Sequence, residues 1–271
     1  MILFPPAKIN LGLNILFKRS DGYHEIETVM VNIPWNDILE ITTSTEDEFV
    51  QTGLEIPGNN SDNLCLKALH LMKNKYNFPR CRIHLWKNIP MGAGLGGGSA
   101  DAAYVLRGIN QFFSLNCSNV ELEEMAAQLG SDCPFFIQDI PRIAKGRGEL
   151  LTPCQLNLSN VWIKLINPGI HISTKEAYEG ITFNKNHGLH SIEDVLSGDK
   201  MQWKNNLIND FEFALFEKYP MLSDLKDKFY DEGAFYAAMS GSGSTIFGLF
   251  DEEPNLNDLP KEYIGHIGKF N

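Results

Sequence analysis

The chain has 271 residues, of which 43% are hydrophobic and 21% charged, as expected for a globular protein of one large or two modest domains. The formal net charge of −11 and the lack of a basic run argue against a nucleic-acid binder, and no stretch has the roughly 20 apolar residues of a transmembrane helix. We expect no signal peptide, and five scattered cysteines without a C-x-x-C pair indicate reduced thiols in a cytoplasmic protein.

Alternating apolar residues predict several strands in the first half of the chain. In the first of these, over residues 8–16, Ile9 and Leu11 share one face, and Lys8 and Asn10 share the other. The other elements expected here are strands over 25–33, 38–43 and 81–86, a helix from 64 that Ser61, Asp62 or Asn63 caps, and helices over 100–113 and 118–130.

The pattern changes after Pro153, and we place a domain boundary near residue 155. The two predicted domains therefore cover 1–155 and 156–271. The elements expected in the second domain are strands over 161–166, 235–239 and 245–250, a capped helix that begins near Ser173, and helices over 206–218 and 221–232.

A glycine-rich segment, Gly92–Ser99, joins a predicted strand to a predicted helix, and we call it the first glycine loop. Glycines let the backbone approach a phosphate closely, and the N–H groups of the loop and of the helix N-terminus can bind an anion. Such a locally positive site is needed for phosphate binding in a chain whose net charge is strongly negative.

Three other interpretations of this loop are possible. Its glycines also fit the G-x-G-x-x-G pattern of dinucleotide sites, but Pro90 separates loop from strand and no clear ribose-binding acid lies near residue 117. A Walker A loop needs Lys and then Ser or Thr after its last glycine, and these residues are missing. The third alternative is a flexible surface loop.

The spacing P-x-x-x-G-L-G-[GS]-[GS]-S, here Pro90–Ser99, resembles the phosphate loop of the galactokinase, homoserine kinase, mevalonate kinase and phosphomevalonate kinase (GHMP) superfamily. Segments along nearly the whole chain resemble one of its members more closely: Pro6–Leu13, Asp21–Ile26, Gly130–Phe136, Ser240–Ser244 and Gly265–Lys269. The resemblance implies an α+β fold with an N-terminal ribosomal-protein-S5-domain-2-like domain and a C-terminal ferredoxin-like α/β domain. It also implies an ATP-dependent kinase that uses Mg²⁺ and phosphorylates a cytidyl diphosphate sugar alcohol.

Two residues are the candidates for catalysis. The resemblance makes Asp132 the base that orients the acceptor hydroxyl and receives its proton late in phosphoryl transfer, since a free Asp, with a pKa of about 3.9, is a weak base. From the sequence alone, Asp132 is equally well a helix cap. The resemblance also makes Lys8 the partner of Asp132, although a lone Lys on a strand is usually solvated.

The remaining candidate residues bind the nucleotide or the acceptor. By resemblance, nucleotide binding is assigned to Asn63, also a possible helix cap, and to Pro90, Met91, Gly92, Ala93, Gly94, Leu95, Gly96, Gly97, Gly98 and Ser99. Acceptor binding is assigned to Asn10, Tyr23, His24, Tyr178, Gly241, Ser242 and Gly243.

Each acceptor residue also has a simpler interpretation. Asn10 could be a buried structural amide, and Tyr23 and His24 could be surface residues, although an aromatic face and an imidazole suit a pyrimidine. Ser240–Ser244, the second glycine loop, could be a tight hairpin and not an anion cradle.

Some polar residues receive no assigned role. Lys145 and Arg147 could add local positive charge. His187 and His190 are three apart in a polar segment and are more typical of a surface than of a metal site, and we predict no carboxylate cage for Mg²⁺.

The partners expected are ATP and the small-molecule substrate, with no nucleic acid and no membrane, for a monomer or a homodimer. Two other functions are possible: another small-alcohol kinase of the superfamily, of the homoserine or mevalonate type, and a catalytically silent nucleotide-binding protein.

Overall fold

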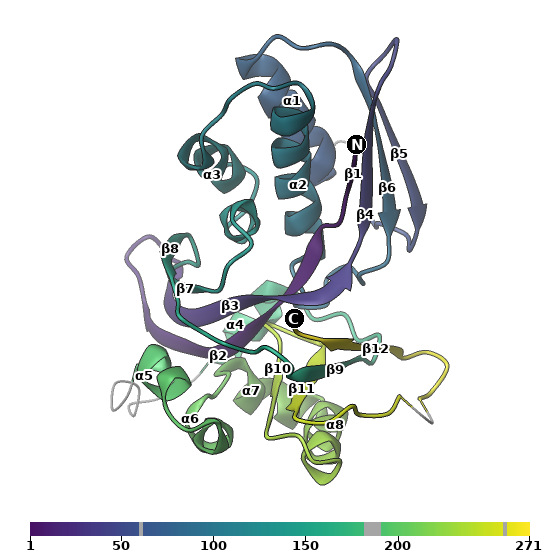
Figure 1. Cartoon of the computed structure of the whole chain (residues 1–271). Coiled ribbons are helices and arrows are strands. Elements are labelled where there is room, and N and C mark those ends of the chain that lie inside the picture. The colour runs from purple at the N-terminus through teal and green to yellow at the C-terminus, as the bar shows by residue number, and fades with distance from the viewer. Residues whose placement is uncertain (60–61, 182–190, 257–258) are drawn as a thin grey trace. The chain divides into compact units, whose positions relative to one another are not determined.

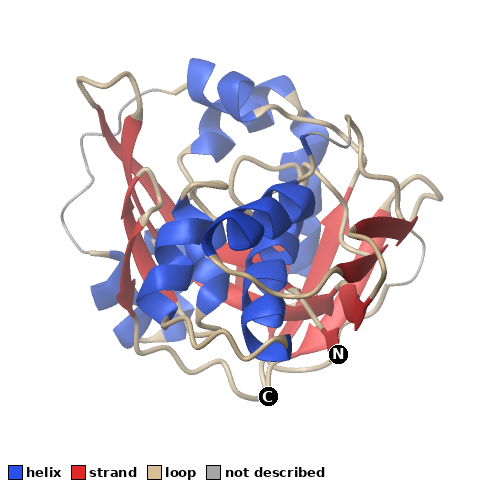
Figure 2. Ribbon diagram, turned by 90° about the horizontal axis from the view of Figure 1, so that it is seen from above, coloured by secondary structure: helices blue, strands red, loops and turns tan. Residues whose placement is uncertain are grey.

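The structure is a computed structural model that describes residues 1–59, 62–181, 191–256 and 259–271. It divides into two compact units that alternate along the sequence. Unit 1 comprises Met1–Ala7, Trp35–Met91 and Gly96–Asp139, and unit 2 comprises Lys8–Pro34, Gly92–Leu95 and Ile140–Asn271. Helices and strands are both abundant, as the predicted α+β class requires (Figure 2). No described helix is long and apolar enough to span a bilayer.

Unit 1 contains a four-stranded sheet with helices on one of its faces (Figure 1). The strand order is β1-β4-β6-β5, in which β5 runs parallel to β6 and the other pairs are antiparallel. The strands are β1 (Ile2–Leu3), β4 (Ile38–Thr43), β5 (Glu48–Gly53) and β6 (Cys81–Lys87). The helices are α1 (Leu64–Lys75), α2 (Gly97–Phe112), α3 (Asn119–Ala127) and a 3₁₀ helix over Cys133–Ile137.

Two helix caps of unit 1 are the ones that the sequence predicts. Ser118 and Glu121 form the predicted capping box of α3, in which each side chain accepts a hydrogen bond from the backbone of the other. Asn63 caps α1 by accepting a hydrogen bond from the N–H of Cys65 at 2.9 Å.

Unit 2 contains two four-stranded sheets, with the orders β2-β3-β7-β8 and β10-β11-β9-β12. The long strands β2 and β3 begin and end, respectively, in unit 1. The strands are β2 (Pro6–Lys18), β3 (His24–Asn36), β7 (Arg142–Gly146), β8 (Leu150–Pro153), β9 (Trp162–Asn167), β10 (Tyr236–Met239), β11 (Ile246–Phe250) and β12 (Ile264–Lys269). The helices are α4 (Thr174–Glu179), α5 (Ile192–Ser197), α6 (Trp203–Asn206), α7 (Phe211–Lys218) and α8 (Pro220–Asp231).

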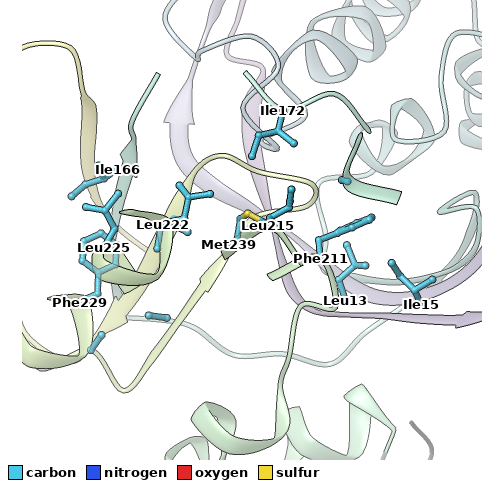
Figure 3. Packing of buried hydrophobic residues seen from close by; sticks show 14 of the residues in the cluster. Leu13, Ile15, Ile166, Ile172, Phe211, Leu215, Leu222, Leu225, Phe229 and Met239 are labelled. Atoms are coloured by element: carbon cyan, nitrogen blue, oxygen red, sulfur yellow. The ribbon is translucent and has the colours of Figure 1, made fainter. Parts of the chain in front are cut away.

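Apolar side chains from β2, β9, α7, α8 and β10 form one buried cluster in unit 2 (Figure 3). Phe229 and Leu222 are fully buried in it, and burying a side chain of this size contributes about 1.5–3 kcal/mol. The cluster therefore fixes the helices against the strands that carry the candidate acceptor residues.

The predicted start of the helix over 206–218 is wrong. α6 ends at Asn206 and α7 begins at Phe211, so that residues 207–210 lie outside both helices. Leu207 is extended, with φ of −100° and ψ of 102°. Asn and Asp favour such positions because their side chains compete with the helix for backbone hydrogen bonds.

Candidate active site

The second half of the first glycine loop begins α2 in unit 1. Gly96 is the N-cap of this 16-residue helix and has a left-handed φ of 68°, without a side-chain capping bond in this described helix. The first N–H groups of α2 are thus available to a ligand, and the helix dipole favours an anion there. The helix begins at Gly97, three residues before the predicted start, because the last glycines of the loop are already helical.

A buried ion-pair triad supports this half of the loop. Lys87, at the end of β6, pairs with Asp37 and, at 2.9 Å, with Asp101 of α2. The Oδ1 atom of Asp37 also accepts hydrogen bonds from the N–H groups of Asn88 at 2.6 Å and Ile89 at 2.9 Å. The triad therefore fixes the chain on both sides of the loop, just before Pro90 and just after Ser99.

The protonation of the triad follows from burial and charge. Burial alone would lower the pKa of Lys87, but the attraction of Asp101 and Asp37 outweighs it, and the pKa is raised. Burial raises the pKa of Asp101 to about 8. Lys87 therefore stays cationic.

A pocket of about 130 Å³, partly open to solvent, lies beside the start of α2 in unit 1. Its lining includes Asn63, Pro57, Met91 and Gly98. The helix-cap interpretation of Asn63 is thus correct, and the same residue also borders a pocket next to the first glycine loop.

Asp132 lies at the start of the 3₁₀ helix in unit 1. Its side chain makes no capping hydrogen bond to this described helix, which disfavours the cap interpretation. The thiol of the next residue, Cys133, is buried, and burial raises its pKa to about 12.

The first half of the first glycine loop packs against the second glycine loop within unit 2. The hydroxyl of Ser240 donates to the carbonyl of Gly94 at 2.9 Å, and the N–H of Thr245 donates to the carbonyl of Ala93 at 3.4 Å. A Cβ atom on Gly94, whose φ is 78°, would lie 2.0 Å from the carbonyl oxygen of Ser240. Glycine is therefore required at this position for both conformational and steric reasons.

Lys8 and Asn10 of β2 lie beside the two loops. The Nζ atom of Lys8 donates to the Oδ1 atom of Asn10 at 2.6 Å, and both atoms lie within 3.5 Å of the position that a Cβ on Gly241 would take. The N–H of Lys8 donates to the carbonyl of Leu95 at 2.9 Å. Lys8 is only 4% exposed, so the solvated-strand interpretation is wrong.

Asn10 is also satisfied as a structural amide. Its Nδ2 atom donates to Thr28 at 3.1 Å, and the hydroxyl of Thr28 donates to the carbonyl of Gly12 at 2.5 Å. This bond fixes the amide orientation, so that its Oδ1 atom faces Lys8.

Unit 2 brings together the aromatic residues of the candidate acceptor site. The rings of His24 and Tyr178 stack with centroids 4.4 Å apart and planes 10° apart. Burial, and then the charge of Lys18, lower the pKa of His24, which keeps the imidazole neutral and able both to donate and to accept. Tyr23 is exposed and lies beneath the guanidinium of Arg147, 4.6 Å from its ring centroid.

Polar bonds hold the turn that carries Tyr23. The N–H of Tyr23 donates to Asp21 at 3.1 Å, and Glu25 accepts from Arg19 at 2.6 Å and from the N–H of Gly146 at 2.9 Å. Lys145 pairs with Glu27 at 3.0 Å. Lys145 thus supports the sheet next to this turn.

The positions of the other candidates differ. Gly241, Ser242 and Gly243 form the second glycine loop between β10 and β11. His187 and His190 lie outside the described residues. In the rest of the described chain, no group of three or more His, Cys, Asp or Glu side chains could hold a metal ion.

The structure leaves one predicted pair untested. Lys8 belongs to unit 2 and Asp132 to unit 1, so their pairing stays a prediction.

The sequence-based search missed the buried polar residues that support the loops. Lys87 could have been found, because it continues the buried face of β6 after Cys81, Ile83 and Leu85 with a period of two. A lysine at the end of an apolar face is unusual and needs a buried partner. Its two carboxylate partners are 50 and 14 residues away, and only the fold reveals them.

Two family models match the chain: that of the GHMP kinases N terminal domain over residues 63–140, and that of the GHMP kinases C terminal over residues 191–262. The chain is 51% identical over 255 residues to 4-diphosphocytidyl-2-C-methyl-D-erythritol kinase of Cytophaga hutchinsonii, with 94% of each chain covered.

Solved structures are similar over nearly the whole chain. A crystal structure of 4-(cytidine 5'-diphospho)-2C-methyl-D-erythritol kinase matches with a TM-score of 0.78 and 31% identity, and the match covers 92% of this chain and 90% of that one. Homoserine kinase from Cytophaga hutchinsonii shares the fold, with a TM-score of 0.68 and 15% identity over 97% of this chain and 94% of that one.

Proposed function

Because the chain belongs to the 4-diphosphocytidyl-2-C-methyl-D-erythritol kinases of the GHMP family, we propose that it transfers the γ-phosphoryl group of ATP to the 2-hydroxyl of 4-diphosphocytidyl-2-C-methyl-D-erythritol. This reaction belongs to the non-mevalonate (MEP) synthesis of isoprenoid precursors. The observation that carries the proposal is the junction of the two glycine loops beside Lys8, together with the stacked His24 and Tyr178.

The first glycine loop binds the phosphates of ATP in this proposal. Three alternate glycines, Gly92, Gly94 and Gly96, have φ between 64° and 78°, so their backbone adopts a conformation that other residues rarely take. The N–H groups of the loop and the N-terminus of α2 supply a local positive potential, which is needed because the net charge of the chain is strongly negative. Adenine then occupies the pocket bordered by Asn63.

The second glycine loop and the aromatic residues bind the acceptor. The neutral His24 suits the edge of cytosine, and the ring of Tyr178 offers a stacking face, with Tyr23 next to His24 in the sequence. Gly241, Ser242 and Gly243 hold the diphosphate with backbone N–H groups, and Asn10 holds a hydroxyl of the alcohol.

Asp132 and Lys8 carry the chemistry of transfer. The Asp132 carboxylate orients the 2-hydroxyl and accepts its proton as the new P–O bond forms and the bond to the ADP oxygen breaks. The Lys8 ammonium stabilises negative charge on the transferring group. Mg²⁺, which accompanies ATP, would be held mainly by nucleotide phosphates and water, because the described residues offer no carboxylate cage.

The test of the proposal is a coupled assay of ADP release with purified protein, ATP, Mg²⁺ and a panel of acceptors: the cytidyl substrate, homoserine and mevalonate. We expect turnover with the cytidyl substrate and a loss of that turnover in folded Asp132→Ala. Turnover only with homoserine or mevalonate would reassign the acceptor, and binding of ATP without turnover of any acceptor would favour the silent nucleotide-binding protein. We also propose a cytoplasmic enzyme, in which the five cysteines are free thiols.

A further inference from the structure

Residues between α6 and α7 connect the strand that carries Lys8 to the second glycine loop. The N–H of Leu13 in β2 donates to the carbonyl of Ile208 at 2.8 Å, and the N–H of Asp210 donates back to Leu13 at 2.9 Å. The Oδ2 atom of Asp210 accepts a further bond from the N–H of Ile15 at 2.6 Å. These bonds fix Asn209, which lies between Ile208 and Asp210, at a defined register along β2.

The side chain of Asn209 faces the beginning of the second glycine loop and is only 1% exposed. Its Nδ2 atom donates to the carbonyls of Met239 and Gly241, each at 2.8 Å. Its Oδ1 atom accepts from the N–H of Phe211 at 3.1 Å. Both amide protons are therefore used to hold two carbonyls on either side of Ser240.

These bonds determine which backbone groups the loop can offer to a ligand. The carbonyl of Gly241 is bound to Asn209, and the carbonyl of Ser240 accepts the N–H of Gly243 at 3.0 Å. Within the described part of the chain, no protein acceptor is found for the N–H groups of Gly241 and Ser242. A loop whose carbonyls are bound inside and whose N–H groups remain available is suited to an anion.

From this geometry, we infer that Asn209 is a positioning residue for acceptor binding: it orients the second glycine loop so that its N–H groups meet the acceptor diphosphate. This inference rests on the proposed function. It deepens that function because it assigns part of the acceptor specificity to a buried side chain that acts only through the loop backbone.

The test is Asn209→Asp, which keeps the shape of the side chain and replaces its donating amide by an oxygen that repels the two carbonyls. We expect the KM for the cytidyl substrate to rise about tenfold or more, with kcat and the KM for ATP within about twofold of the wild-type values. Calorimetric titration with CDP, which needs no turnover, should show the same loss of affinity. Hydrogen exchange should accelerate in residues 240–244.

The matched control is Asn110→Asp in α2. Asn110 also donates to a backbone carbonyl, that of Cys117, at 3.1 Å and accepts the N–H of the same residue at 2.9 Å, but it belongs to neither glycine loop. We expect it to lower thermal stability without changing the KM for the cytidyl substrate.

The possible outcomes separate the inference from the proposed function. If wild-type protein lacks turnover with the cytidyl substrate, the proposed function fails, and the exchange and CDP data then decide the inference alone. Unchanged exchange in 240–244 with unchanged CDP affinity would overturn it, as would an equal rise in both KM values. If Asn209→Asp does not fold, Asn209→Ala is measured against the same criteria.

Discussion

In the proposed function both glycine loops bind phosphate groups, and their structures differ. The first glycine loop continues into the 16-residue helix α2, so the anion site proposed there combines a helix N-terminus with alternate glycines of positive φ. The second glycine loop continues into strand β11 and relies on the buried side chain of Asn209 to bind its carbonyls. The backbone of the first loop is thus shaped by its own glycines and supported by the triad at its two ends, whereas the second loop depends on a side chain some 30 residues earlier.

This difference predicts how substitutions divide between the two substrates. Changes that act only on the first glycine loop should affect ATP, and changes that act only on the second should affect the acceptor. Changes at the junction of the loops, where Gly94 meets Ser240 beside Lys8, should affect both or the chemical step itself.

The largest effect is expected from Lys8→Ala, which removes the cation beside the junction. Because the proposed function gives its ammonium the role of stabilising the transferring phosphoryl group, kcat should fall about 10²- to 10³-fold, with smaller changes in either KM. Steady-state kinetics with both substrates varied is the measurement. Lys75→Ala, which removes an exposed lysine paired with Glu121, should leave kcat unchanged. A near-normal kcat in folded Lys8→Ala would contradict the catalytic role.

A smaller loss is expected from Gly94→Ala, which forces the two loops apart. The new Cβ would lie 2.0 Å from a backbone oxygen that cannot rotate away, so kcat/KM should fall roughly 10²-fold for both substrates. The control is Gly233→Ala, where φ is also positive, at 96°, but no atom lies within 4 Å. Both variants carry a backbone strain of about 1–2 kcal/mol, and only Gly94→Ala should lose activity. Equal activity in the two would show that the loops do not need close contact.

The sequence predicted the first glycine loop, the main strands and the family because local patterns encode them. Alternation defines β2 and β6, and a serine followed three residues later by Glu121 defines the start of α3. The GHMP family and the α+β class are confirmed by the family models and the similar structures.

The supports of the site could not be predicted because they join residues that are distant in sequence. Asp37 and Lys87 are 50 residues apart, and Asn209 and Met239 are 30 apart. The helix predicted over 206–218 also placed Asn209 in a helix interior. The buried bonds of its side chain and its pairing with β2 outweigh that local preference.

Tyr178→Ala should weaken the binding of the acceptor but not that of ATP. Loss of a stacking face for the base should cost about 1–3 kcal/mol of binding, and the KM for the cytidyl substrate should rise roughly 5- to 150-fold while that for ATP stays constant. Tyr178→Phe keeps the ring and its edge contact with Phe211, and should retain most of the affinity. Titration with CDP measures the effect directly. An unchanged CDP affinity in Tyr178→Ala would remove this residue from the acceptor site.

Asp37→Asn should have the smallest effect of these substitutions and should change the binding of ATP but not that of the acceptor. The substitution removes one charge from the buried triad and weakens the acceptor of the Asn88 and Ile89 N–H groups, but Asp101 still pairs with Lys87 at 2.9 Å. We therefore expect a thermal destabilisation below the about 3–5 kcal/mol of a fully broken buried pair. The KM for ATP should rise roughly fivefold, equivalent to about 1 kcal/mol of binding.

Asp139→Asn is the matched control for Asp37→Asn, because Asp139 also belongs to unit 1 and pairs with Arg107 at 2.6 Å but is about two-fifths exposed. An exposed pair contributes about 0–1 kcal/mol, so neither KM should change. If Asp37→Asn instead raised the KM of the cytidyl substrate as much as that of ATP, support of the first glycine loop would not be specific to the nucleotide. The proposed assignment of one substrate to each loop would then be wrong, because the side chains of the triad hold Asn88 and Ile89, which precede the first glycine loop, and Asp101, which follows it.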